Sequence, residues 1–100
     1  MGKLNLNRLV QEDLSKILEY YERETGDRRL GERFFREYRR LLGRIAEERK
    51  RYTLHRLGTR RSRFMRFPYS VVFRVFDDVE IRILFLRHDK RHPRFGMERK

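Results

Sequence analysis

The chain is short, cysteine-free and strongly basic, with 100 residues, 27 Lys and Arg against 15 Asp and Glu, and a net charge of +12. This length predicts a single domain over residues 1–100 and excludes a deep cleft between two domains. The absence of cysteine excludes disulfides, thiolate nucleophiles and Cys-ligated zinc, and no apolar run approaches a membrane span or a signal peptide. We therefore expect a cytoplasmic protein with no membrane partner, attracted to polyanions or to an acidic protein.

The excess positive charge lies in the C-terminal half. Residues 1–50 hold 13 basic and 10 acidic side chains, whereas residues 51–100 hold 14 and 5. Arginine supplies 22 of the 27 basic residues, and its planar guanidinium suits phosphate and carboxylate groups. The second half is therefore the first place to look for a binding surface.

The first half predicts a short strand followed by a helical hairpin. Residues 3–7 alternate polar and apolar side chains, as an edge strand does, and Asn7 is a good helix N-cap. The first helix has an apolar stripe at Val10, Leu14, Ile17, Leu18 and Tyr21. Gly26 can adopt the left-handed conformation that ends it, and Asp27 can cap a second helix that runs to about Arg49. The second apolar stripe consists of Leu30, Phe34, Phe35, Tyr38, Leu41, Leu42 and Ile45.

The second helix is also rich in arginine. Acidic residues stand one helical turn from several of these arginines, in the pairs Glu32–Arg36, Glu37–Arg40 and Glu47–Arg51. Such pairs stabilise a helix by a few tenths of a kcal/mol each. We therefore interpret this face as a solvated, salt-bridged helix surface.

The remainder of the chain is rich in β-forming residues. Residues 52–58 break the helical pattern and predict a loop containing His55. Residues 60–66 predict a strand, and Phe67 and Pro68 turn the chain because proline fixes its own φ and favours an extended predecessor. Two further β-rich runs flank an Asp77-Asp78 pair and predict a hairpin: residues 69–76 and 79–87.

The register of this hairpin decides which side chains share a face. A two-residue loop places Glu80 and Arg82 on the same face as Tyr69, Val71 and Phe73. A three-residue loop or a β-bulge instead gathers the apolar side chains on one face: Tyr69, Val71, Phe73, Val75, Ile81, Ile83 and Phe85. We favour the second arrangement, because it gives the helices one apolar surface to cover.

In that arrangement the other face is mixed. Val72, Leu84 and Leu86 would lie exposed there among Arg74, Glu80 and Arg82. Exposed apolar patches of this kind usually mark a partner site. The alternative is that the C-terminal tail folds over the patch.

Several short residue groups follow one another in a characteristic order over nearly the full chain. They are Asp13-Leu14, Ile17, Tyr20-Tyr21, Phe34-Phe35, Arg60-Arg61, Arg66-Phe67-Pro68-Tyr69, Phe73-Arg74-Val75 and Arg87-His88-Asp89-Lys90-Arg91-His92-Pro93. Together they resemble the RelE/ParE superfamily of bacterial toxins from type II toxin-antitoxin systems. The resemblance implies an α+β fold with the order β-α-α-β-β-β. In this fold an N-terminal strand and a helical hairpin precede a three-stranded antiparallel meander, and the helices pack on one face of a small sheet. The resemblance further implies growth inhibition and plasmid stabilization.

The resemblance also implies partners. A cognate antitoxin would wrap the toxin with an acidic or apolar segment in a hetero-oligomer, and we assign its contacts to Val72, Arg74, Leu84 and Leu86. RelE-like members cut messenger RNA on the ribosome, whereas ParE-like members poison DNA gyrase without cutting nucleic acid. We favour the gyrase hypothesis, because residues 10–21 and 30–45 form helices that are long for so small a domain.

The nuclease hypothesis requires a base, cations that stabilise the phosphorane, and an acid. The candidates for this chemistry are Arg61, Arg87, His88 and His92. Histidine suits proton transfer near neutral pH, but a histidine that caps the strand end by bonding to backbone is the alternative for His88. Two histidines at i and i+4 are too few for zinc, so we expect no metal and no cofactor.

Further cations can contact either target. We assign target or nucleic-acid binding to Arg60, Arg63, Arg82, Lys90 and Arg91. A third hypothesis, a basic nucleic-acid-binding module, is weakened by the shortage of exposed aromatics for stacking and of any groove-reading motif.

Overall fold

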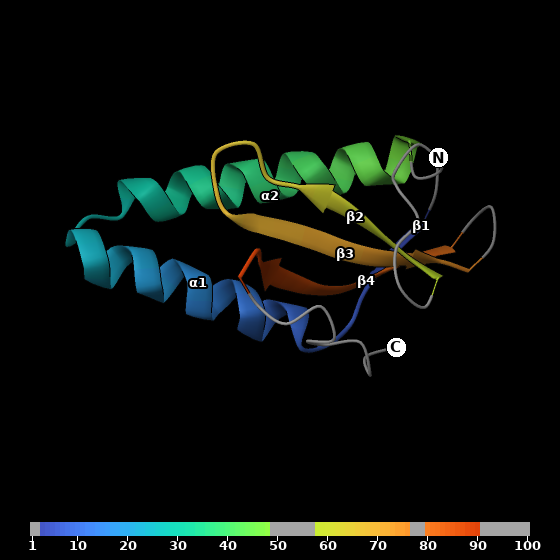
Figure 1. Ribbon diagram of the computed structural model, residues 1–100, viewed down its shortest axis with the longest axis horizontal. Coiled ribbons are helices and arrows are strands. Elements are labelled where there is room, and N and C mark those ends of the chain that lie inside the picture. The colour runs from blue at the N-terminus through green and yellow to red at the C-terminus, as the bar shows by residue number, and fades with distance from the viewer. Residues whose placement is uncertain (1–2, 49–57, 77–79, 91–100) are drawn as a thin grey trace.

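The computed structural model describes residues 3–48, 58–76 and 80–90. Its elements are β1 (Lys3–Leu6), α1 (Val10–Thr25), α2 (Arg29–Glu48), β2 (Thr59–Arg63), β3 (Tyr69–Val75) and β4 (Glu80–His88). The two helices form an antiparallel hairpin alongside the sheet (Figure 1). The predicted α+β class and β-α-α-β-β-β order are therefore confirmed. The expected loop around His55, the Asp77-Asp78 turn, Arg91 and His92 lie outside the described residues.

The four strands form one sheet in the order β1-β4-β3-β2. Strands β2, β3 and β4 make the expected antiparallel meander. β1 runs parallel to β4, with Leu4 opposite Ile81 and Leu6 opposite Ile83. A parallel pair requires a long crossover connection, and the helical hairpin between β1 and the meander supplies it. No helix among the described residues is long and apolar enough to cross a membrane.

A β-bulge at Leu84 changes which side chains of β4 face the helices beyond that residue. Val75 pairs with Ile81 and Phe73 with Ile83, but Val72 pairs with Phe85, so Leu84 is the extra residue. The apolar face that we favoured is confirmed up to this point, because Val71, Phe73, Ile81 and Ile83 are all buried in the main core. The pairing there corresponds to the three-residue alternative, since the Phe76 N–H donates to the Glu80 carbonyl at 3.0 Å, and the bulge alters the pairing only beyond Ile83.

Beyond the bulge two side chains occupy the faces opposite to those expected. Leu86 pairs with Val71 and is buried in the main core beneath the helices. Phe85 pairs with Val72 and forms a second buried cluster with Val72 and Leu84. The expected placement of Phe85 and Leu86 is wrong, because an extra residue exchanges the faces of everything that follows it.

The helix ends follow from local chemistry. Asn7 Oδ1 accepts a hydrogen bond from the backbone N–H of Leu9 at 2.9 Å, but the N-cap of α1 is Leu9 and has no side-chain cap bond. The predicted N-cap at Asn7 is therefore wrong, because the helix begins later. Gly26 ends α1 in the left-handed region, with φ of 67°. Asp27 Oδ1 accepts the backbone N–H of Arg29 at 2.9 Å, and its other oxygen pairs with the Arg29 guanidinium at 2.8 Å. The side-chain hydrogen bond from Arg29 holds the pKa of Asp27 below its usual value. The predicted cap at Gly26 and the predicted capping role of Asp27 are thus confirmed.

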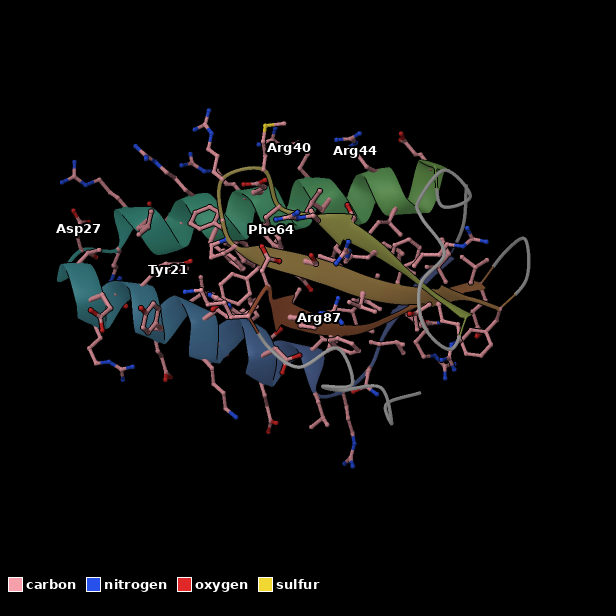
Figure 2. The ribbon with its side chains drawn as sticks, in the orientation of Figure 1. Tyr21, Asp27, Arg40, Arg44, Phe64 and Arg87 are labelled. Atoms are coloured by element: carbon pink, nitrogen blue, oxygen red, sulfur yellow. The ribbon has the colours of Figure 1, made fainter. Side chains whose placement is uncertain are left out.

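The main core is built around Phe34 of α2. Its ring stacks on Phe64 with centroids 4.4 Å apart and meets the edges of Phe67 at 5.0 Å and Tyr69 at 5.4 Å. The ring of Tyr21 on α1 completes the cluster, with its centroid 6.0 Å from that of Phe34. Since aromatic side chains bury large areas, this cluster gives a basic chain of modest apolar content its core (Figure 2).

Two helix carboxylates accept hydrogen bonds from backbone N–H groups in the C-terminal half of the chain. Asp13 of α1 accepts the backbone N–H of Leu86 at 3.2 Å. Glu37 of α2, which is buried, accepts the backbone N–H of Met65 in the segment between β2 and β3. Charge-assisted bonds of this kind are stronger than neutral ones.

The expected ion pairs on α2 do not form. Among the described residues neither Glu32–Arg36 nor Glu37–Arg40 forms an ion pair. The Glu37 carboxylate instead turns inward to the segment after β2. Arg51, the expected partner of Glu47, lies outside the described part of the chain. The interpretation of this face as salt-bridged is therefore wrong within the residues described.

Candidate functional site

The face of the sheet opposite the helices carries most of the candidate arginines. The register places Arg63, Ser70 and Arg87 in one row across β2, β3 and β4. Because side chains alternate between faces along a strand, Arg61 shares this face with Arg63. Arg74 and Arg82 form another row near the β3–β4 turn.

Arg87 is the most buried of these cations, with only 5% of its surface exposed. Its removal from water and the positive charge of Arg61 lower the pKa of Arg87, while the nearby Asp89 carboxylate partly offsets them. Arginine nevertheless stays protonated in proteins. The result is a partly desolvated positive centre at the end of β4.

Asp89 is the neighbouring acid that the sequence interpretation missed. Its carboxylate pairs with Arg63 at 2.9 Å, and its backbone N–H donates to the carbonyl of Pro68 at 2.8 Å. Asp89 thereby holds the end of β4 against the β2–β3 connection. The strand register was the signal needed to find this pair, since the two residues lie 26 positions apart.

His88 lies on the other face of the sheet. It pairs with Tyr69, whose ring it meets edge-on with centroids 4.9 Å apart. Its Nδ1 accepts the backbone N–H of Lys90 at 3.0 Å. This is the strand-end cap given above as the alternative for His88. Because Arg61 and Arg87 lie on the opposite face, the sheet stands between their guanidiniums and the His88 ring.

The target-binding candidates are also divided between the two faces. Arg60 pairs with Phe73, a core residue, and so faces the helix side, whereas Arg63 faces the opposite side. Arg82 lies over the ring of Phe76 at 4.9 Å and pairs with Glu80 at 3.2 Å, near the other end of β4 from Lys90. These cations therefore do not form one surface.

The exposed apolar patch expected on this face is absent from the described residues. Val72 and Leu84 are fully buried, together with Phe85, and Leu86 is buried on the helix side. The expectation of exposure is wrong, because apolar side chains on both faces of this sheet are removed from water and the bulge turns Leu86 inward. Arg74, which is half-buried, is the one antitoxin-contact candidate of the four with exposed surface.

Comparison with known proteins gives the family. A model described as the ParE toxin of the type II toxin-antitoxin system parDE matches residues 4–93. The chain belongs to the ParE toxin family. It is the toxin component of a type II toxin-antitoxin module, and its partner is a cognate antitoxin. The resemblance to RelE/ParE toxins noted in the sequence is thereby confirmed.

A solved structure described as a chromosomal ParDE toxin-antitoxin system from P. aeruginosa is similar to this toxin. The TM-score is 0.77 at 22% sequence identity, with 88% of this chain and 96% of that chain covered. Because the identity is low, this likeness shows the shared fold alone. No curated protein matches the chain.

Proposed function

We propose that this toxin arrests bacterial growth in the cytoplasm by binding DNA gyrase, and that it cuts no RNA itself. Membership of the ParE family supports the choice of target. The observation that carries the proposal is the position of His88, whose ring faces the helix side while Arg61 and Arg87 face the other.

Metal-free RNA cleavage needs its proton donor and acceptor beside the cations that stabilise the phosphorane. Arg61 and Arg87 lie close enough for the charge of one to lower the pKa of the other. They can hold an anionic group, but neither can take up a proton near neutral pH. Among the described residues, the only histidine packs against Tyr69 and bonds to backbone instead.

We assign contact with the gyrase target to Arg61 and Arg63 on the positive face of the sheet, beside which Arg87 lies buried. Three guanidiniums at one end of the sheet, of which that of Arg63 pairs with Asp89, suit an acidic protein surface. We assign antitoxin contact on the same face to Arg74 rather than to Val72 and Leu84, because both of these apolar side chains are fully buried.

Expression of His88→Gln separates the gyrase hypothesis from the nuclease hypothesis. Glutamine can accept the Lys90 N–H through its side-chain oxygen but cannot transfer a proton near neutral pH. We expect growth arrest, filamentation and a DNA-damage response from both the wild type and His88→Gln, with full-length messages in both cultures. Growth, cell length and message length measure this.

Arg61→Ala is the companion variant, and we expect it to reduce toxicity by removing a target contact. Cleaved messages in the wild-type culture that become intact in His88→Gln would contradict the proposal. Co-expression of the cognate antitoxin is the control for specific toxicity, because it should restore growth in every culture.

A further inference from the structure

A cleft of about 390 Å³ opens between α2 and the segment that joins β2 to β3. Its lining contains six arginines from these two sides: Arg33, Arg36, Arg40, Arg44, Arg63 and Arg66. Figure 2 shows Arg40 and Arg44 projecting from the side of α2 that faces away from α1. The cleft adjoins the row of Arg63, Ser70 and Arg87 on the sheet and shares Arg63 with it.

Little negative charge offsets these arginines. Among the described residues Glu37 is the only acid in the lining, and its carboxylate is buried and bonded to the backbone N–H of Met65. Arg63 pairs with Asp89 at 2.9 Å. Within the described part of the chain no ion pair involves Arg36 or Arg40, although acidic residues stand one turn away on the same helix. The cleft therefore has a strong net positive charge.

The arginines of α2 follow a line rather than a ring. Arg33, Arg36, Arg40 and Arg44 stand at i, i+3, i+7 and i+11, which puts them on one side of the helix. At 1.5 Å of rise per residue this line extends about 16 Å. A single phosphate or carboxylate would contact only part of it. The arrangement instead suits a polymer with regularly repeated negative charges, such as a nucleic-acid strand with one phosphate per about 3.4 Å of helix axis.

The remaining lining distinguishes among polyanions. Leu41 and Phe67 are buried, and Met65, 82% exposed, is the only apolar side chain that a partner could reach in the described part of the lining. Single-stranded nucleic acids are bound by stacking on exposed aromatics, and none lines this cleft. Protein interfaces usually place aromatic anchors beside arginine at their centre, and no exposed aromatic stands among the described residues of this lining. Binding to a duplex backbone needs only positive charge.

We propose that this cleft binds the phosphate backbone of a duplex nucleic acid without reading its sequence. The proposal goes beyond the gyrase target and does not depend on it. It gives the toxin two adjoining surfaces that meet at Arg63, one for a protein on the sheet and one for phosphates beside α2.

The test is the salt dependence of duplex binding, measured by fluorescence anisotropy with the purified full-length toxin. The probes are a short duplex DNA, a duplex RNA and a single-stranded DNA of the same sequence, between about 50 and 200 mM salt. Each phosphate contact contributes about 0.9 to the slope of log K against log salt. A triple variant, Arg36→Ala, Arg40→Ala and Arg44→Ala, is expected to lower that slope by about 2 to 3. All three side chains are exposed, so the fold should be retained, and Arg40→Glu alone serves as a milder second variant.

A matched control removes the same charge from the other side of the molecule. Arg8, Lys16 and Arg23 are exposed on or just before α1 and do not line the cleft. Their simultaneous replacement by alanine should leave the slope within about one contact of the wild type. Cleft-dependent binding of either duplex supports the proposal, and the tighter duplex identifies the source of the phosphates. Equal loss in both triple variants, equal or tighter binding of the single strand, or binding of polyglutamate but of neither duplex would overturn it.

Discussion

Replacing Phe34 with alanine should lower the free energy of unfolding by about 3 to 5 kcal/mol. Phe34 is fully buried and stands between α2 and the sheet, with four aromatic rings around it: Tyr21, Phe64, Phe67 and Tyr69. Its removal leaves a cavity that several of these rings border, so the loss combines the transfer free energy with lost packing. Small domains have a total stability of about 5 to 15 kcal/mol. The variant should therefore be largely unfolded at moderate urea concentrations.

The neighbouring Phe35 is the matched control. It is 38% exposed on the same helix, and its contacts are Tyr38 at 6.3 Å between ring centroids and the Arg39 guanidinium at 6.0 Å. Phe35→Ala should cost about 1 kcal/mol or less, since exposed substitutions usually do. Urea denaturation of the two variants gives both values. Similar losses in the two would mean that Phe34 is not at the centre of the core.

Replacing Leu84 with aspartate should also unfold the toxin. Leu84 is the bulge residue of β4 and is fully buried with Val72 and Phe85. A carboxylate placed there would be charged and without solvent, or would remain protonated with a raised pKa. The expected loss in the free energy of unfolding is on the order of 4 kcal/mol, as is typical when a substitution buries a charge or creates a cavity. The prediction tests whether the second face of the sheet is covered.

Leu6→Asp is the control for this substitution. Leu6 is on β1 and is 46% exposed, so the same chemical change should cost about 1 kcal/mol or less there. Circular dichroism and urea denaturation compare the two variants. If Leu84→Asp remained folded and failed only to bind the antitoxin, the patch would be exposed after all, and the original sequence interpretation of that face would be correct.

Elements with a strong periodic signal were predictable from the sequence. The apolar stripes of both helices, the left-handed Gly26 and the Asp27 cap each follow from local chemistry and need no knowledge of the tertiary fold. The pairing of β3 with β4 was also predictable, because two β-rich runs lie close together in the sequence. The strand ends were placed within a few residues, as with β2, which ends at Arg63 rather than at residue 66.

The site was less predictable, because it depends on one residue of register. The bulge at Leu84 exchanges the faces of Phe85 and Leu86, and it determines that Arg87 shares a face with Arg61. Local propensity does not position a bulge, because the bulge follows from packing on both faces at once. The inward turn of Glu37 is a second case: its hydrogen bond to Met65 joins residues far apart in sequence and takes the place of a helical ion pair.

The most direct test of the account is gyrase activity with the purified toxin. We expect DNA supercoiling by gyrase to be inhibited as the toxin concentration rises, with His88→Gln as effective as the wild type and Arg61→Ala weaker. The parallel reaction contains ribosomes and messenger RNA, and we expect the message to stay intact in it. Unchanged supercoiling at excess toxin, together with message cleavage that His88→Gln abolishes, would contradict the account.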